Sequence, residues 1–383
     1  MRWRVQVGEM KPNAAMASQL SQVLSSGWFS PGPKVAEFER KFAEAHNAKY
    51  AVMVNSGTDA LRIGLLALKE LNGWGPADEV IVPAATFVAT YNIVRQSGMK
   101  PVLCDVDEKT FCLEPERIVK AMSSRTRAVI PVHLFGLSCP MPSPSLGLSV
   151  LEDSCESVGD VLRGDVAAYS TYACHVISTG VGGVILTNDE KTLAFLRSYA
   201  NHGRDPLFLG GLNGDGMDPK DLINRRFSFL REGYSARSTE FQAAVGIPQI
   251  DSLATLLARR GDIAYFYRKE FSPLVKAGVI QIQDIPIGRH HAHMMFPIIL
   301  NQHDRAEVCV ELEKDGIETR TALPLVTQPM YSGYWTPTDY PNAYRLATQG
   351  FYVGCHQDMT IEDAAYVVDR LSHVLKREVT LAA

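Results

Sequence analysis

Two segments of the chain have the residue types that bind an anion and a protonated ring nitrogen. In residues 56–59, Ser-Gly-Thr-Asp, the glycine lets a phosphate approach the backbone, and a following helix would offer free N–H groups and a favourable dipole. Asp153 ends an apolar run, where a carboxylate could keep a ring nitrogen protonated and make the ring an electron sink. Both patterns also have structural interpretations, because Ser-Gly-Thr-Asp is a good helix N-cap and a strand-end Asp can cap a turn.

His175 lies in a third segment, residues 170–183, which runs from a serine to a pair of glycines. Imidazole moves protons near neutral pH, and the Ser170 hydroxyl, five residues earlier, could face a phosphate. In a fourth segment, 233–246, Gly-Tyr-Ser and Arg237 precede a small-residue helix. Alone, His175 could be a hydrogen-bonded core histidine and the fourth segment an ordinary capped helix. The four segments therefore have to be interpreted together.

The elements expected around these segments are short apolar strands that alternate with helices. Strands are predicted at 50–54, 79–83, 101–106, 128–132 and 149–153, and helices at 13–26, 34–46, 58–71, 87–97, 240–271 and 361–376. This alternation predicts an α/β fold whose mostly parallel sheet is covered by helices. Ligands of such sheets lie beyond the carboxyl ends of the strands, where 55–59, Asp153 and His175 would meet. Residues 204–228, rich in Gly, Asp, Asn and Pro, predict a mobile surface excursion.

Length and composition limit the class of protein. A chain of 383 residues can form one large and one small domain, which we expect at 1–245 and 246–383. The net charge of -4 argues against a nucleic-acid or membrane-surface partner. An N-terminus without an apolar core, and no run long enough to span a bilayer, favour a cytoplasmic location. No metal site is expected, because the seven cysteines are scattered without a C-x-x-C pair.

The four segments, in this order and spacing, resemble the sugar aminotransferases of the DegT/DnrJ/StrS family, which are fold-type-I pyridoxal phosphate (PLP) enzymes. Further matches extend the resemblance over nearly the whole chain. They are 27–39 (GWFSPGPKVAEFE), 82–90 (VPAATFVAT), 105–107 (DVD), 324–329 (PLVTQP) and 354–357 (GCHQ). The resemblance implies a large domain with a mostly parallel seven-stranded sheet and a smaller C-terminal α+β domain.

His175 occupies the slot in which this family has the lysine that forms a Schiff base with PLP. An imidazole cannot hold the cofactor in this way, but it can transfer protons. Within the family, the histidine is similar to that of the 3-dehydratases of 4-keto-6-deoxy nucleotide sugars. Segment 152–157 (EDSCES) resembles these dehydratases more than the alanine-rich aminotransferases, and segment 351–357 (FYVGCHQ) resembles the GDP-sugar member. The cytidine-sugar member carries an iron–sulfur cluster, which the cysteines of this chain do not match.

The resemblance also implies roles for individual residues around PLP or pyridoxamine phosphate (PMP). Phe87 would stack on the ring, Asp153 would pair with its nitrogen, and Glu156 would lie near its hydroxyl. The complete set of expected cofactor-binding residues is Ser56, Gly57, Thr58, Phe87, Asp153, Glu156, Ser170 and Ser235.

Other residues are expected to contact a nucleotide-linked sugar. Tyr234, Ser235 and Arg237 lie in the segment that usually reaches a neighbouring subunit's site, which implies a homodimer with shared active sites. The substrate contacts are expected among Trp28, Phe29, His202, Arg204, Arg237, Arg320 and His356. The chain departs from the family at two positions, with Val181 where Glu is usual and Ser235 where Asn is usual.

Three hypotheses follow from the sequence. The first is a dehydratase that uses PMP to remove the C3 hydroxyl of a nucleotide-linked 4-keto-6-deoxy sugar, with His175 as the catalytic base and glutamate able to regenerate PMP. The second is a lysine-less PLP enzyme that decarboxylates or transaminates another amine-bearing substrate, as the Val181 and Ser235 departures would allow. The third is a non-catalytic ligand-binding protein with the same fold.

Overall fold

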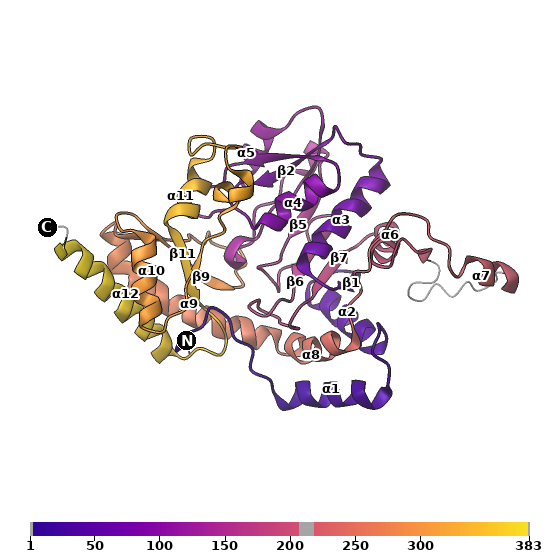
Figure 1. Ribbon diagram of the computed structural model, residues 1–383, viewed down its shortest axis with the longest axis horizontal. Helices are drawn as coiled ribbons and strands as arrows, with labels where there is room; N and C mark the ends of the chain where they lie inside the picture. The colour runs from indigo at the N-terminus through magenta and orange to yellow at the C-terminus, as the bar shows by residue number, and fades with distance from the viewer. Residues whose placement is uncertain (1–2, 207–217, 382–383) are drawn as a thin grey trace.

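The computed structural model describes residues 3–206 and 218–381 of the chain, and its larger part is built on a seven-stranded sheet (Figure 1). The strands are β1 (Tyr50–Val54), β2 (Glu79–Pro83), β3 (Lys100–Cys104), β4 (Thr126–Val129), β5 (Ser149–Asp153), β6 (Val166–Ser170) and β7 (Gly183–Thr187). Their order in the sheet is β1-β7-β6-β5-β4-β2-β3. Only β7 runs antiparallel to its neighbours, β1 and β6, so the predicted mostly parallel sheet is confirmed.

The larger part also contains helices, and several of them pack on this sheet. The helices are α1 (Ala14–Ser26), α2 (Pro33–Ala45), α3 (Gly57–Asn72), α4 (Val88–Gln96), α5 (Pro115–Ala121), α6 (Glu190–Ala200), α7 (Pro219–Arg225) and α8 (Glu240–Asp251). The central helix α3 packs against β5, β6 and β7 through apolar residues that are almost completely buried. It begins at an N-cap serine, Ser56, and ends at Gly73, whose φ of 66° is the left-handed conformation that favours glycine.

The predicted excursion at 204–228 is only partly described, because residues 207–217 lie outside the described part of the chain. Its described part contains α7, which projects away from the large sheet in Figure 1. The helix predicted at 240–271 is divided in two at Ser252, so that α8 is followed by α9 (Leu253–Lys276).

A second, antiparallel sheet forms the smaller part, in the order β10-β11-β9-β8. Its remaining elements are β8 (Ile280–Ile282), β9 (Met295–Leu300), α10 (Arg305–Lys314), β10 (Arg320–Thr321), α11 (Pro341–Gln349), β11 (Gly350–Gly354) and α12 (Ile361–Leu381). This part has its own apolar core, in which Val5 from the N-terminal segment also packs. The proposed domain boundary at residue 245 lies inside α8.

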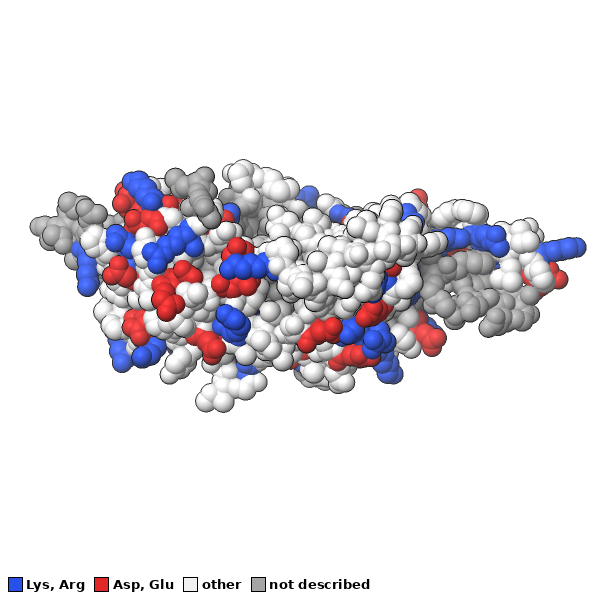
Figure 2. Space-filling model, turned by 90° about the horizontal axis from the view of Figure 1, so that it is seen from below, with Lys and Arg blue, Asp and Glu red and all other residues white. Residues whose placement is uncertain are grey.

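The molecular surface carries both signs of charge, but one area is almost uncharged. Figure 2 shows acidic and basic side chains interspersed beside a broad neutral area on the face to which α1 and α8 contribute. Residues 12–33, which include α1, contain no Lys, Arg, Asp or Glu. No helix in the described ranges is both long and apolar enough to cross a bilayer.

Candidate active site

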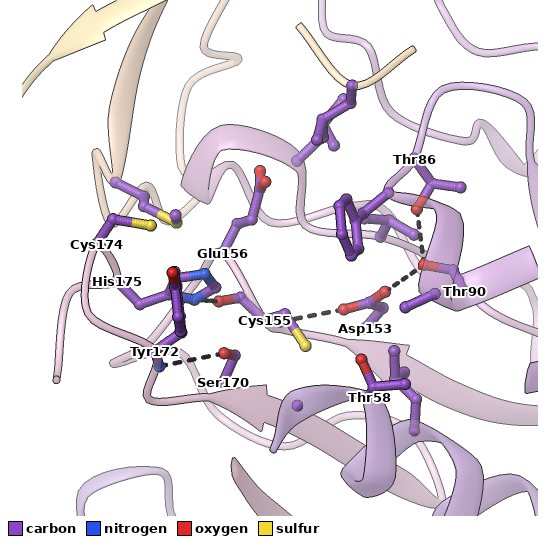
Figure 3. Close-up of a pocket in the computed structure, with 18 of the residues that line it drawn as sticks. Thr58, Thr86, Thr90, Asp153, Cys155, Glu156, Ser170, Tyr172, Cys174 and His175 are labelled. Atoms are coloured by element: carbon purple, nitrogen blue, oxygen red, sulfur yellow. Dashed lines mark hydrogen bonds between the residues drawn. The ribbon is translucent and has the colours of Figure 1, made fainter. Parts of the chain in front are cut away.

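A cavity of about 390 Å³ lies where the carboxyl ends of β5 and β6 meet the start of α3 (Figure 3). The larger part of the protein supplies most of its wall, and the smaller part supplies an apolar side. The residues around it are Ser56, Gly57, Thr58, Leu61, Thr86, Phe87, Ala89, Thr90, Val132, Leu134, Asp153, Cys155, Glu156, Ser170, Tyr172, Cys174, His175, Val181, Gly182, Met294, Met295, Leu323 and Tyr352. The structure therefore brings together most of the predicted cofactor residues and His175.

The N-terminus of α3 forms one wall and has the geometry of an anion site. The Ser56 Oγ accepts a hydrogen bond from the Asp59 N–H at 3.1 Å, so the N-cap interpretation of this serine is also correct. The N–H groups of Gly57 and Thr58, in the first turn of the helix, have no carbonyl partner within it. A Cβ on Gly57 would lie 2.7 Å from the Ser170 Cβ, so only glycine fits here. Backbone donors and the Ser170 hydroxyl thus face one small space.

Asp153, at the end of β5, is a buried carboxylate that its neighbours hold in place. Its Oδ2 accepts a hydrogen bond from the Thr90 hydroxyl at 2.7 Å, and its Oδ1 accepts one from the Cys155 N–H at 3.1 Å. Burial raises the pKa of Asp153, and the hydrogen bonds from Thr90 and Cys155 oppose this rise. The arrangement suits a carboxylate that faces a protonated ring nitrogen.

His175 lies in the loop between β6 and β7, half-buried in the cavity wall. Its Nδ1 contacts the carbonyl oxygen of Cys155 (Figure 3). Because a carbonyl only accepts, Nδ1 carries the hydrogen and Nε2 is left with a free lone pair. Burial lowers the pKa of His175 to about 4, so the imidazole is neutral at physiological pH. It is therefore prepared to accept a proton at Nε2.

Glu156 adds a second proton-carrying group to the same wall. Its Oε2 accepts a hydrogen bond from the Phe135 N–H at 2.6 Å. Burial, reinforced by the charge of Asp153, raises the pKa of Glu156 to about 8. At pH 7 this carboxyl is therefore mostly protonated and can donate a hydrogen bond, in contrast to a surface glutamate.

Several predicted site residues do not reach the cavity within one chain. Ser235 and Arg237 are exposed, and the Arg237 guanidinium lies 3.2 Å from the Ser235 Oγ and 3.3 Å from the His202 Nε2. Trp28 and Phe29, which follow α1, are 56% and 47% exposed. These residues gather on the outer surface of the large part instead of around His175.

The other predicted substrate residues are also held elsewhere. Arg204 donates hydrogen bonds to the carbonyl oxygen of Arg226, and Arg320 forms an ion pair with Glu318. His356 is buried beside the N-terminal segment, in a second and smaller cavity. Arg204 is held within the larger part and Arg320 by a carboxylate two residues away, whereas the position of His356 depends on the N-terminal segment, which is distant in the sequence.

Other residues that line the cavity were not among the predicted site residues. Thr86 and Thr90 flank the Phe87 motif, and their four-residue spacing was a signal that they could meet on one side of a helix start. Tyr172 lies edge-on to the His175 ring, with centroids 6.2 Å apart. In the described ranges, no group of three or more His, Cys, Asp or Glu side chains could hold a metal ion.

Comparison with known proteins identifies the relatives of this fold. Residues 12–372 match the DegT/DnrJ/EryC1/StrS aminotransferase family. The chain is 32% identical to GDP-perosamine synthase of Caulobacter vibrioides over 97% of this chain and 98% of that protein. Among solved structures, a GDP-4-keto-6-deoxymannose-3-dehydratase mutant with bound GDP-perosamine has a TM-score of 0.83, 25% identity, and coverage of 96% of this chain and 100% of that one. NtdA from Bacillus subtilis, with bound cofactor PMP, has a TM-score of 0.80, 27% identity, and coverage of 94% and 81%.

Proposed function

Because the chain belongs to the DegT/DnrJ/EryC1/StrS aminotransferase family, we propose that it is a PMP/PLP-dependent 3-dehydratase of a nucleotide-linked 4-keto-6-deoxy sugar. One observation carries the proposal: His175, whose Nδ1 contacts the Cys155 carbonyl oxygen, lies in a cavity wall whose residues include no lysine. A wall without lysine cannot hold PLP covalently, whereas a neutral imidazole can transfer protons. The family resemblance to a 3-dehydratase at this position supports the choice of reaction.

The cavity fits PLP or PMP on the properties of its own residues. A Cβ on Gly57 would fill the space beside Ser170, and the free N–H groups of Gly57 and Thr58 suit a phosphate. Phe87, which is 58% exposed on the cavity wall, offers a ring face for stacking, and Asp153 offers a buried carboxylate. When bound, the cofactor supplies an electron sink that makes an adjacent C–H bond acidic.

His175 would act as the base of the reaction. Its Nε2 would accept a proton on the cavity side. Its Nδ1–H would meanwhile keep donating to the Cys155 carbonyl oxygen, and this contact fixes the orientation of the ring. The same nitrogen can return that proton to a departing hydroxyl group. Groups placed in this way contribute typically about 10²–10⁴ to a rate. Protonated Glu156 would donate a hydrogen bond within the same cavity.

The substrate and a second subunit belong to the same proposal. No lining residue of the cavity is Arg or Lys, so a nucleotide diphosphate needs cations from outside it. Arg237 and His202 lie on an exposed segment that a neighbouring copy of the chain could bring to the cavity. The neutral face around α1, where Leu24 is 63% exposed, offers a surface for this homodimer.

A second candidate, transamination or decarboxylation of an amine-bearing substrate, is favoured by the aminotransferase family itself and by the similarity to GDP-perosamine synthase. Val181 at the cavity, 52% exposed, would give such a substrate an apolar contact where the family usually has an acid. The two candidates differ in their product. Dehydration removes the C3 hydroxyl, whereas transamination leaves it and exchanges an amine.

A His175→Lys variant, with His175→Asn as its control, tests the proposal. The purified proteins would be incubated with PMP, glutamate and GDP-4-keto-6-deoxymannose, and the products analysed by mass spectrometry. We expect both variants to lose dehydration, and only the lysine variant to retain PLP covalently after borohydride reduction. Dehydration that survives in His175→Lys refutes the role of His175. Exchange of an amine by the wild type with the C3 hydroxyl of the sugar retained supports the second candidate, and failure to bind PLP or PMP would leave a non-catalytic ligand-binding protein.

A further inference from the structure

A chain of hydroxyl groups lies behind Asp153 and has no part in the mechanism above. The Thr86 and Thr90 Oγ1 atoms are 2.8 Å apart, and the Thr90 Oγ1 is 2.7 Å from the Asp153 Oδ2 (Figure 3). Both threonines have no exposed surface, and Asp153 is 4% exposed. Three polar side chains from two separate segments of the sequence therefore meet at the buried side of the cavity wall.

The direction of these hydrogen bonds follows from the chemistry of the three groups. An ionised carboxylate only accepts, so the single hydroxyl proton of Thr90 must point to Asp153. The Thr90 oxygen can then only accept from Thr86, which makes Thr86 the donor. The proton direction is thus fixed along the whole chain, from Thr86 to Thr90 to Asp153.

The surroundings of Asp153 explain why such a donor matters. Burial disfavours a charged carboxylate, and the titratable groups that face it are the Cys155 thiol, Glu156 and His133. Glu156 is mostly protonated at neutral pH. The His133 Nε2 lies 2.9 Å from the Glu152 Oε2, so His133 is paired with Glu152. Thr90 donates a side-chain hydrogen bond to Oδ2, the Cys155 backbone N–H donates to Oδ1, and the Cys155 thiol also lowers the pKa of Asp153 through a hydrogen bond.

We propose that Thr90, oriented by Thr86, is a positioning residue that keeps Asp153 ionised and directed at the cofactor ring nitrogen. The inference rests on the proposed cofactor site, and it assigns to the start of α4 a task beyond supporting the sheet. Thr90 acts through Asp153 and needs no contact with the cofactor itself. A hydrogen bond to a charged group is worth enough to change its protonation state in a buried site.

The smaller part of the protein holds α4 in the position that this task requires. The Tyr331 hydroxyl bonds to the Asn92 Oδ1, and the Tyr331 ring packs edge-on against Tyr91, with centroids 5.0 Å apart. Tyr91 and Asn92 directly follow Thr90 in the helix. The contacts of Tyr331 with Tyr91 and Asn92 therefore hold in place the turn of α4 that carries the Thr90 hydroxyl.

The test compares Thr90→Val, which keeps the shape and removes the hydroxyl, with Thr90→Ser, which keeps the hydroxyl. The full-length proteins would be titrated with PLP, and the absorbance of bound PLP followed against pH. We expect Thr90→Val to weaken PLP binding roughly 10- to 100-fold and to lower the deprotonation midpoint of the ring nitrogen by about one to two pH units. Thr90→Ser should keep the wild-type PLP affinity and the wild-type midpoint. Thr86→Val should change the affinity and the midpoint in the same direction as Thr90→Val, but by less.

Unchanged affinity and an unchanged midpoint in Thr90→Val would overturn the inference. So would a Thr90→Ser protein that behaves like Thr90→Val, because packing of the methyl group would then explain the loss. If circular dichroism shows that Thr90→Val does not fold, PLP affinity and the ring-nitrogen midpoint are compared between Thr86→Val and Thr90→Ser instead. The inference then requires a loss in Thr86→Val and wild-type values in Thr90→Ser. A wild-type protein that binds neither PLP nor PMP refutes the proposed function instead, which is a different result from a variant that binds normally.

Discussion

Gly57→Ala tests most directly whether the start of α3 is the phosphate site. Its Cβ would lie 2.7 Å from the Ser170 Cβ and 2.9 Å from the Cys155 Sγ. Ordinary contacts of this kind begin at 3.4 Å, so the first is 0.7 Å too short. Both contacted atoms belong to residues in the cavity wall. The substitution must therefore displace either the turn or the wall that it faces.

The size of the effect follows from the cost of overpacking. An extra methyl group in a well-packed site costs about 1–3 kcal/mol. If the displaced atoms form the phosphate site, this energy corresponds to an affinity for PLP that is roughly 5- to 150-fold weaker. Alanine is a better helix former than glycine by about 0.5–1 kcal/mol, which opposes only the loss of stability and not the loss of affinity. We therefore expect the change in PLP affinity to exceed what the change in stability explains.

The assay is a PLP titration by absorbance, together with thermal unfolding of each protein without cofactor. Gly261→Ala is the matched control, because Gly261 lies in α9 and an added Cβ would meet nothing within 4 Å. It should raise stability slightly and leave PLP affinity unchanged. If the Kd of Gly57→Ala for PLP stays within about threefold of the wild-type value, a difference of roughly 0.7 kcal/mol, the phosphate does not bind at this turn.

Two further predictions concern the base and the ring. As the pH falls, kcat/KM should decrease with a midpoint near pH 4, because burial lowers the pKa of the His175 imidazole to about 4 and only its neutral form accepts a proton. A decrease with its midpoint at 6.5, the ordinary pKa of histidine, would contradict this effect of burial. Phe87→Leu should weaken PLP binding about two- to tenfold, because stacking on an aromatic ring is worth about 0.5–1.5 kcal/mol. Thermal stability should change little, because the Phe87 side chain is 58% exposed. A large loss of stability with normal PLP binding would contradict a stacking role.

Local patterns predicted β1 to β5 and the cavity edge of the sheet, whereas β6 and β7 were not among the predicted strands. Apolar strands that alternate with helices require a covered, mostly parallel sheet, and ligands of such a sheet lie at its carboxyl edge. Asp153 ends β5 and Ser170 ends β6, so parallel pairing of the two strands brings them to that edge. The position of His175 follows from the short loop that leads to β7.

Other parts of the site could not be predicted in this way. Thr90 donates to Asp153 across a separation of 63 residues, and no short sequence pattern contains both. His356 lies in the motif 354–357, but the N-terminal segment packs beside it and places it in a second cavity, a contact between residues more than 340 positions apart that no local pattern contains. The place of β7 between β6 and β1 also depends on pairing with β1, which is more than 120 residues earlier in the sequence.

The loss of the lysine changes what the rest of the cavity has to do. In the family frame, one amine both retains the cofactor and transfers protons, whereas His175 can perform only the second task. Under the proposed function, retention would come from non-covalent contacts, and the proposed ones are the N–H groups at Gly57, the Asp153 carboxylate and the Phe87 ring. Each such contact has a larger share of the binding energy than it would have beside a covalent bond. Small changes behind the wall, such as removal of the Thr90 hydroxyl, should therefore be visible as loss of cofactor, and this makes the protein well suited to measuring those contacts one at a time.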